Sequence, residues 1–322
     1  MTRPKILVTR RWPEAVEARL AARYEVTLNP DDVILSHADL AAAAMAYDAI
    51  LPTVTDRIGA EMFARGARVR MLGNYGVGFS HIDIAAAQAA GVVVTNTPDV
   101  LSDCTADLAM MLILMAGRRA SEGERFLRAG LWTGWRPGQL IGRKVTGATL
   151  GIVGFERIGQ ALAHRAHHGF GMRVLVHNRS PIADAVLRAC DARQVATLDA
   201  LLPEVDFLSL HCPGGAANRH LIDARRLHLM RRDAYLVNTA RGEVVDEAAL
   251  AAALRDGVIA GAGLDVFEAE PRVHPGLLEL ETVTLLPHLG SATRETRDAM
   301  GHRVVDNLDA FFAGREPPDR VA

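Results

Sequence analysis

The sequence predicts an α/β protein built from two doubly wound, parallel-sheet domains. Short apolar runs alternate with amphipathic stretches along the chain, a pattern typical of parallel sheets covered by helices. A strand-like run, a glycine-containing turn and a helical pattern follow one another from residue 149 and begin a second series of this kind. Charged residues then follow three late apolar runs, which is typical of sites at the carboxyl edge of a parallel sheet.

The first series occupies the first hundred residues. Its apolar runs predict strands at 5–10, 24–29, 47–53, 69–76 and 91–98, with a helix at 15–24. A long helical pattern follows at 102–119 and could cross between domains. The next segment, about 126–147, contains Trp132, Trp135 and several glycines. We expect an irregular excursion there, whose large apolar side chains pack against another surface.

The second series begins after this excursion. It predicts a helix at 158–170 and strands at 149–154, 172–178, 205–213, 234–242, 259–267 and 283–288. The final segment, 291–312, is again helical. We expect it to return to the first domain, so that residues 1–99 and 289–322 form one domain and residues 100–288 the other.

Composition excludes several classes of protein. The 322 residues can form two cores, and a net charge of −2 gives no general attraction to nucleic acid or anionic membranes. Three cysteines are too few for a disulfide framework. The N-terminus lacks the apolar segment of a signal peptide, and the longest apolar run, 108–117, is too short to span a bilayer. We therefore expect a cytoplasmic protein with no membrane or nucleic-acid partner.

The turn at the start of the second series resembles a dinucleotide-binding fingerprint. Gly154 and Gly159 occupy the first and third glycine positions of G-x-G-x-x-G, between a predicted strand and a predicted helix. Glu156 replaces the second glycine. A carboxylate about 4 Å from a phosphate charge costs on the order of 4 kcal/mol at an effective dielectric constant of about 20. Glu156 could avoid this cost by turning to solvent or pairing with Arg157.

The end of the following strand indicates which dinucleotide is bound. NAD selection usually needs an acid here for the ribose 2′-hydroxyl. This chain has Asn178, Arg179 and Ser180 instead, and Arg179 with Ser180 could bind a 2′-phosphate. NADP is therefore preferred, and NAD stays possible. Arg179 could alternatively be a solvated surface residue.

Three charged residues near the end of the chain suit acid–base chemistry on a carboxylate substrate. Arg241, Glu270 and His288 each follow an apolar, strand-like run. An arginine can hold a carboxylate through two hydrogen bonds, and a histidine can transfer one proton near neutral pH. A nearby glutamate can orient that histidine and keep it protonated. The set suits reduction of a 2-keto acid or oxidation of a 2-hydroxy acid.

Almost the whole chain resembles the D-isomer-specific 2-hydroxyacid dehydrogenases, most closely their glyoxylate/hydroxypyruvate reductase branch. The resemblance runs through NYGVGFSHID, GIVGFERIGQALA, VLVNTARGEVVDEAAL, AGAGLDVFEAEP and LLPHLGSAT, in the order of the family. It implies a Rossmann-type cofactor domain at 100–288, a flavodoxin-like substrate domain from the remainder, and a cleft between them. It also implies a homodimer formed through the excursion.

The resemblance implies a role for each site residue. His288 is the proton donor to the substrate carbonyl, Glu270 its hydrogen-bond partner, and Arg241 the carboxylate anchor. Val77, Gly78 and Ser291 complete substrate binding. Asp265 holds the nicotinamide carboxamide. The other expected cofactor contacts are Thr105, Gly154, Arg157, Ile158, Gly159, Asn178, Arg179, Ser180, Cys212, Pro213, Thr239, Ala240, His288 and Gly290.

Two further expectations concern metals and an alternative function. His164, His167 and His168 share a predicted helix, but no H-E-x-x-H motif is present, so we expect no metal. The alternative to a reductase is a cofactor-sensing regulatory or scaffold protein with a weakened cofactor site, which Glu156 alone favours.

Overall fold

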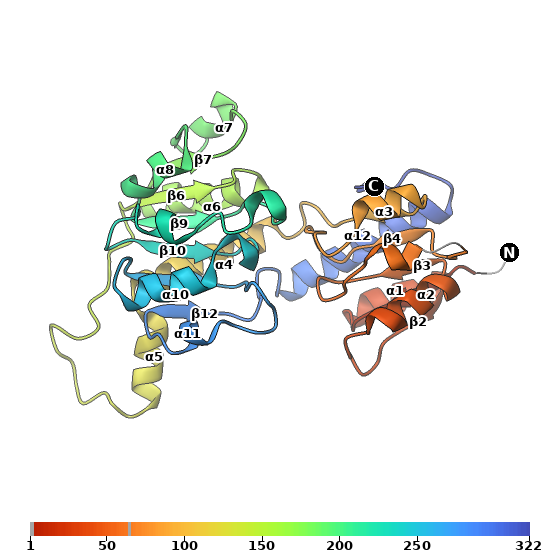
Figure 1. Cartoon of the computed structure of the whole chain (residues 1–322), viewed down its shortest axis with the longest axis horizontal. Helices are drawn as coiled ribbons and strands as arrows, with labels where there is room; N and C mark the ends of the chain where they lie inside the picture. The colour runs from red at the N-terminus through yellow and green to blue at the C-terminus, as the bar shows by residue number, and fades with distance from the viewer. Residues whose placement is uncertain (1–2, 64–65) are drawn as a thin grey trace. The chain divides into compact units, whose positions relative to one another are not determined.

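The computed structural model describes residues 3–63 and 66–322, which separate into two compact units (Figure 1). Unit 1 comprises Met1–Leu101 and Ala292–Ala322, and unit 2 comprises Ser102–Ser291. Each unit contains one sheet in which all strand pairs are parallel. The predicted α/β class with two parallel sheets is therefore confirmed.

Unit 1 is built on a five-stranded sheet in the order β2-β1-β3-β4-β5. This order reverses direction between β1 and β3, as in flavodoxin-like sheets. The strands are β1 (Lys5–Val8), β2 (Glu25–Thr27), β3 (Ala49–Leu51), β4 (Met71–Gly73) and β5 (Val93–Thr95). The helices are α1 (Glu14–Arg23), α2 (His37–Ala46), η1 (Ala60–Phe63), α3 (Ile84–Ala89) and α12 (Arg294–Phe312).

The C-terminal segment is fastened to unit 1 at two places. Arg19 of α1 binds Asp306 and Asp309 of α12, with N–O distances of 2.5 and 3.2 Å. Val94 of β5 exchanges backbone hydrogen bonds with the last two residues of the chain. Unit 1 is therefore assembled from both ends of the sequence.

Unit 2 is built on a seven-stranded sheet in the order β12-β11-β10-β9-β6-β7-β8. The direction reverses between β6 and β9, which is the Rossmann arrangement with one added strand. The strands are β6 (Thr149–Val153), β7 (Arg173–His177), β8 (Ala192–Gln194), β9 (Phe207–Leu210), β10 (Tyr235–Asn238), β11 (Gly261–Leu264) and β12 (Val283–Leu285).

Helices surround this sheet. The longer ones are α4 (Ser102–Gly117), α5 (Ala120–Arg128), α6 (Arg157–Phe170) and α10 (Glu247–Arg255). The shorter ones are α7 (Asp184–Arg188), α8 (Leu198–Leu201), η2 (Leu202–Glu204), η3 (Ala216–Asn218), α9 (Ala224–Leu227), η4 (Gly242–Val244) and α11 (Pro275–Leu278). None of the helices within the described residues is long and apolar enough to cross a bilayer.

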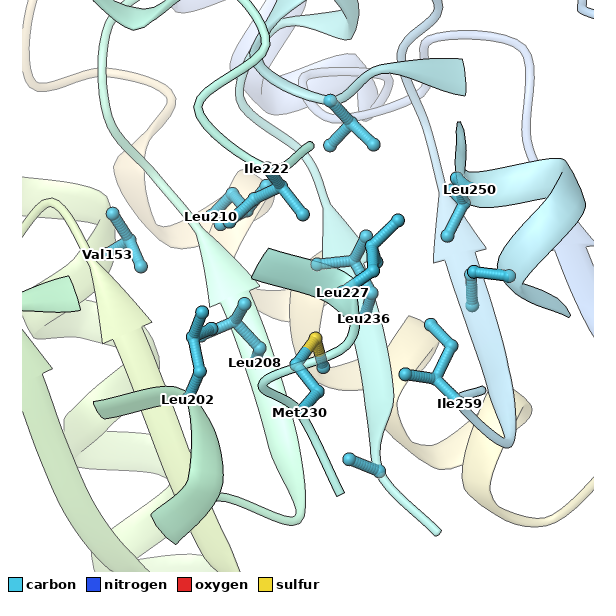
Figure 2. Packing of buried hydrophobic residues seen from close by; sticks show 14 of the residues in the cluster. Val153, Leu202, Leu208, Leu210, Ile222, Leu227, Met230, Leu236, Leu250 and Ile259 are labelled. Atoms are coloured by element: carbon cyan, nitrogen blue, oxygen red, sulfur yellow. The ribbon is translucent and has the colours of Figure 1, made fainter. Parts of the chain in front are cut away.

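The core of unit 2 explains the apolar runs of its sequence. On one face, Leu208 of β9 and Leu236 of β10 pack with Leu227 of α9 and Leu250 of α10, and all four are fully buried (Figure 2). The other face is covered by α4 and α6, where Leu112 and Leu162 are also fully buried. Strands buried on both faces need consecutive apolar residues, and each such side chain contributes about 1.5–3 kcal/mol on burial.

The helix predicted at 102–119 is observed as α4, but the predicted position of its end was wrong. It stops at Gly117, and α5 begins at Ala120 where no helix was predicted. Arg119 between them has a left-handed backbone with φ of 53°. Its guanidinium forms two 2.7 Å hydrogen bonds with Glu122, which hold the chain at this turn.

The excursion after α5 carries the two tryptophans that we expect to pack against another surface. Figure 1 shows α5 and the following loop extending from the rest of unit 2. Trp132 is 53% exposed and Trp135 is 81% exposed. Their apolar surfaces find no cover within the described part of this chain.

Candidate active site

The candidate residues of unit 2 follow the carboxyl ends of six strands. These ends lie on one edge of the sheet because every pair is parallel. The residues after β6, β7, β9, β10, β11 and β12 are respectively Gly154, Asn178, Cys212 with Pro213, Thr239 to Arg241, Asp265 with Glu270, and His288 to Ser291. The fold therefore gathers these sequence-distant positions along one edge.

His288 and Glu270 form a hydrogen-bonded pair. His288 Nδ1 lies 2.8 Å from Glu270 Oε2, and the other carboxylate oxygen accepts the Phe267 N–H at 3.0 Å. Burial alone would raise the pKa of Glu270, but the hydrogen bond and charge of His288 outweigh it and hold that pKa below its usual value. Glu270 thus stays ionised at neutral pH, and it loses its charge only as pH falls through this lowered pKa. The pair leaves Nε2 of His288 available for proton transfer.

A buried carboxylate fixes the backbone that carries His288. Asp265 is 1% exposed, and its two oxygens accept the N–H groups of Leu289 and Gly290 at 2.6 and 2.8 Å. The His288 N–H donates to the Asp265 carbonyl at 2.9 Å. Burial raises the pKa of Asp265, against the opposing effect of these N–H groups. His288 itself has a left-handed backbone, with φ of 56°.

Thr105 fixes the same segment from α4. Its hydroxyl donates to the Gly290 carbonyl at 3.0 Å, and the residue is 4% exposed. The structure therefore brings together Thr105, Asp265, His288 and Gly290. Ser291 is partly buried at the end of unit 2.

Arg241 follows a turn organised by Asn238. The Asn238 amide donates to the Arg241 carbonyl at 2.9 Å and accepts the Ala240 N–H at 3.0 Å. Asn238 is 1% exposed. Sequence reasoning missed its role, although its place at the strand end, three residues before Arg241, is a usable signal. Burial lowers the pKa of Arg241, while Glu270 and Glu243 raise it.

Gly242 allows the loops that carry Arg241 and Glu270 to approach closely. A Cβ atom at position 242 would lie 1.8 Å from the carbonyl carbon of Phe267. No side chain can be accommodated at that distance. The closeness of the two loops agrees with the electrostatic effect of Glu270 on Arg241.

The glycine turn fits a dinucleotide phosphate group. Gly154 has φ of 88°, and a Cβ atom there would lie 2.6 Å from the Cys212 nitrogen. A Cβ atom on Gly159 would lie 2.4 Å from the Gly154 carbonyl oxygen. Both glycines are thus sterically required. Helix α6 begins at Arg157, with Ile158 as its second residue, so its N-terminus lies at this turn. The backbone N–H groups at a helix N-terminus attract anions.

Glu156 occupies a position that does not require glycine. It is the exposed N-cap residue of α6, with φ of −84° and ψ of −162°. These angles are extended backbone that any residue can adopt. Its side chain forms no capping hydrogen bond. The departure from the fingerprint therefore leaves the turn itself intact.

The remaining predicted cofactor positions follow β7, β9 and β10. Asn178 is partly buried, while Arg179 and Ser180 are exposed. Burial raises the pKa of Cys212 to about 11, so its thiol stays neutral. The Pro213 carbonyl accepts the Asn218 amide at 2.8 Å. The Thr239 hydroxyl is buried and has no hydrogen-bond partner within the described residues.

Val77 and Gly78 belong to a loop of unit 1 whose carbonyl groups are occupied. The Asn74 amide donates to the Gly76 and Gly78 carbonyls at 2.9 and 3.1 Å, and the Asn96 amide donates to the Val77 carbonyl at 2.9 Å. Across the described residues, the N–H groups of Val77 and Gly78 donate no hydrogen bond. A loop whose carbonyl groups accept hydrogen bonds, and whose N–H groups donate none, can bind an anion through those N–H groups.

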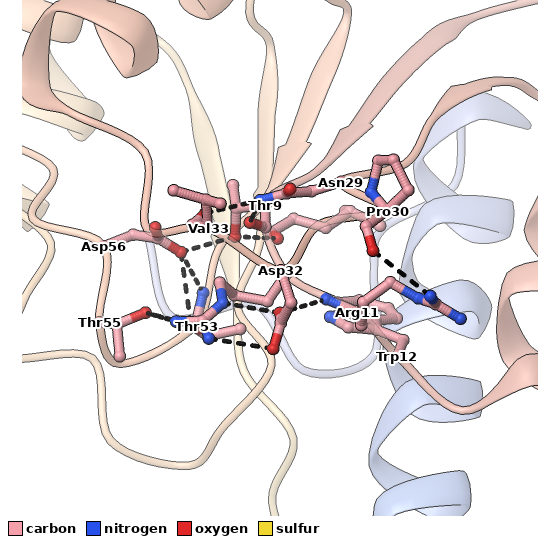
Figure 3. Close-up of polar contacts among 12 residues, drawn as sticks. Thr9, Arg11, Trp12, Asn29, Pro30, Asp32, Val33, Thr53, Thr55 and Asp56 are labelled. Carbon is pink, nitrogen blue, oxygen red and sulfur yellow. Dashed lines mark hydrogen bonds and ion pairs between the residues drawn. The ribbon is translucent and has the colours of Figure 1, made fainter.

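A second polar network at the same edge of unit 1 was not predicted. Asp56 is fully buried and accepts the Thr9 hydroxyl at 2.6 Å and the Thr53 N–H at 2.8 Å (Figure 3). Asp32 accepts the Arg11 N–H at 2.8 Å. These bonds tie together the loops that follow β1, β2 and β3. The bonds Thr9–Asp56 and Arg11–Asp32 join residues that are 47 and 21 positions apart in sequence, so no local pattern indicates them.

Comparison with known proteins places these features in context. Residues 110–290 match the family described as D-isomer specific 2-hydroxyacid dehydrogenase, NAD binding domain. The chain is 45% identical to a glyoxylate reductase of Thermococcus onnurineus over 99% of this chain and 96% of that protein. It is 42% identical to a glyoxylate reductase of Thermococcus litoralis over 99% of this chain and 97% of that protein.

Solved structures agree with these matches. An NADPH-dependent glyoxylate/hydroxypyruvate reductase of Sinorhizobium meliloti, in complex with NADP and malonate, has a TM-score of 0.88 and 36% identity, and the alignment covers 100% of this chain and 97% of that one. A Polaromonas protein described as a D-isomer specific 2-hydroxyacid dehydrogenase, NAD-binding, has a TM-score of 0.92 and 37% identity, and the alignment covers 99% of this chain and 100% of that one.

Proposed function

The chain belongs to the D-isomer-specific 2-hydroxyacid dehydrogenase family, and we propose that it reduces glyoxylate or hydroxypyruvate to the 2-hydroxy acid with NADPH. The observation that carries this proposal is the His288–Glu270 pair beside Arg241 at one sheet edge. The names of these relatives support glyoxylate as a substrate.

The residues of unit 2 divide the chemistry among them. Nε2 of His288 donates a proton to the carbonyl oxygen of the substrate. Glu270 orients the ring through Nδ1 and stabilises its protonated form, since an ionised carboxylate favours a neighbouring imidazolium. Arg241 holds the substrate carboxylate and polarises the carbonyl. A dinucleotide held at the turn of Gly154 and Gly159 would supply the hydride that reduces C2 of the substrate.

Other residues complete the proposed assignment of sites. Val77 and Gly78 would bind carboxylate oxygen through their N–H groups, with Ser291 as a further substrate contact. Asp265, Thr105 and Gly290 would contact the nicotinamide end of the dinucleotide. The domain at 1–99 and 289–322 would bind substrate, and the domain at 100–288 the dinucleotide.

The cofactor end of the proposal rests on the turn and the loop after β7. The family match supports NAD(P) binding, and the steric demand at Gly154 and Gly159 supports a phosphate site at the turn. Arg179 is exposed. Its charge beside Ser180 favours a 2′-phosphate, and hence NADP over NAD.

A fluorescence titration with NADPH and NADH, run beside a glyoxylate-reduction assay, tests the proposal. We expect tight NADPH binding by this chain and by the Glu156→Gly variant, with dissociation constants within about tenfold of each other. We expect the exposed carboxylate to turn toward solvent, and so to avoid the roughly hundredfold to thousandfold penalty of a direct phosphate contact. Both proteins should reduce glyoxylate.

Other outcomes would overturn parts of this proposal. A large gain in affinity for Glu156→Gly would show that the carboxylate opposes the phosphates. Dinucleotide binding without reduction of any 2-keto acid by either protein would favour the cofactor-sensing regulatory alternative.

We also propose that the chain forms a homodimer through the excursion after α5. Trp132, Trp135 and Ile141 are 53%, 81% and 67% exposed, an apolar surface typical of a protein interface. Light scattering after size-exclusion chromatography should give a dimer mass for the native chain and a monomer mass for a Trp132→Glu, Trp135→Glu double variant. Leu278→Glu, at a 63% exposed apolar site elsewhere, is the matched control and should stay dimeric.

A further inference from the structure

The side chain of Gln194 supports the loop that follows β7. Its Nε2 donates to the Ser180 carbonyl at 3.0 Å and to the Asn178 carbonyl at 3.4 Å, while its Oε1 accepts the Ile182 N–H at 2.9 Å. Gln194 is the last residue of β8, and its Cα pairs with that of Val176 in β7. One side chain therefore satisfies three backbone groups of a loop that has no strand partner of its own.

The supported loop carries the two residues expected to select the dinucleotide. Arg179 and Ser180 are exposed, and the two carbonyl groups held by Gln194 lie on either side of Arg179 in sequence. Arg179 also acts electrostatically on Cys212, since its charge lowers the pKa of that thiol against the larger effect of burial. The guanidinium therefore lies near the end of β9, which the glycine turn also approaches.

Asn178 connects this loop to the glycine turn. Its Oδ1 accepts the Phe155 N–H at 3.4 Å, and its Nδ2 donates to the Ser180 carbonyl at 3.2 Å. Gln194, the loop at 178–182 and the turn that begins at Gly154 thus form one hydrogen-bonded assembly. A displacement of the loop would move Arg179 directly, whereas the turn is also held by the close packing of Gly154 on Cys212 and of Gly159 on the Gly154 carbonyl group.

We propose that Gln194 is a positioning residue that sets the preference for a 2′-phosphorylated dinucleotide by holding Arg179 and Ser180 in place. The inference rests on the proposed preference for NADP. Two hydrogen-bonding groups that are held in advance bind a phosphate without the cost of ordering a loop. NAD lacks the 2′-phosphate, so its binding depends on the glycine turn and not on this support.

The test is a set of titrations of the full chain with two pairs of probes. NADPH and NADH are followed by nicotinamide fluorescence, and 2′,5′-ADP and 5′-AMP by calorimetry. In Gln194→Leu, NADPH and 2′,5′-ADP should each bind about tenfold more weakly, while NADH and 5′-AMP change by less than about twofold. Gln194→Glu keeps the acceptor for Ile182 but loses both donors, and it should behave like the leucine variant.

Gln160 provides the matched control. Its Nε2 donates to the Phe155 carbonyl at 2.9 Å, so it supports the turn that both dinucleotides share. Gln160→Leu should weaken the binding of NADPH and the binding of NADH by the same factor. In an Arg179→Ala background, Gln194→Leu should cause no further loss of NADPH affinity, because the guanidinium that Gln194 positions has been removed.

The possible failures can be told apart. Two results would overturn the role of Gln194 and leave the NADP preference standing. In the first, Gln194→Leu weakens the binding of all four probes equally. In the second, Gln194→Leu leaves NADPH binding unchanged while Arg179→Ala weakens it. If the native chain binds NADPH and NADH equally and Arg179→Ala changes neither, the proposed preference itself is wrong, and the inference about Gln194 falls with it. Thermal unfolding identifies any variant that has lost its fold. If one Gln194 variant is unfolded, the binding measurements on the other Gln194 variant test the proposal.

Discussion

Replacing His288 with alanine is expected to lower kcat for glyoxylate reduction by about 10²–10⁴-fold. The variant removes the group whose Nε2 donates the proton, while Nδ1 and its 2.8 Å bond to Glu270 serve only to orient the ring. Binding of NADPH should change little, because the glycine turn and the loop after β7 are untouched. Single-turnover kinetics at saturating substrate measures the effect on the chemical step.

His288→Gln and His228→Ala serve as comparisons. Glutamine retains a polar side chain but cannot donate a proton as an acid, so kcat of the His288→Gln variant should be as low as that of His288→Ala. His228 is an exposed histidine at the end of α9, and its replacement should leave kcat unchanged. Turnover near the native rate in the His288→Ala variant would remove the proton-donor assignment.

The second large effect is expected at Arg241. Arg241→Ala should raise KM for glyoxylate by roughly a hundredfold, which corresponds to about 3 kcal/mol of lost charge-assisted hydrogen bonding. Arg241→Lys should recover part of this loss, since lysine keeps the charge but cannot form two parallel bonds to a carboxylate. Steady-state kinetics over a wide range of glyoxylate concentration separates KM from kcat.

An exposed arginine tests whether this effect is local. Arg255→Lys, at the end of α10, should leave both constants unchanged. If Arg241→Ala leaves KM near the native value, another group must bind the substrate carboxylate. The N–H groups of Val77 and Gly78 would then be the first candidates.

The sequence alone was enough to predict both sheets and the neighbourhood of Arg241, Glu270 and His288. The reason is physical: strands buried on two faces need unbroken apolar runs, and the carboxyl ends of parallel strands meet at one edge. Polar residues that directly follow such runs must therefore share that edge. The resemblance to the dehydrogenase family is likewise confirmed.

The supporting contacts could not be predicted because they depend on register and on distant partners. Gln194 reaches the loop at 178–182 only because β8 pairs with β7 so that Gln194 lies opposite Val176. Asp265 accepts two N–H groups from residues that follow β12, and no local pattern encodes that geometry. The turn at Arg119 was missed because arginine is otherwise compatible with a helix.

The left-handed backbone of His288 bears on how this position can evolve. A residue with a Cβ atom loses roughly 1–2 kcal/mol in that conformation relative to one where it is relaxed, whereas glycine adopts it freely. Selection for folding stability alone would thus favour glycine at position 288. An imidazole at position 288 therefore has a conformational cost that glycine lacks, and the hydrogen bonds with Asp265 and Thr105 hold the two residues that follow it.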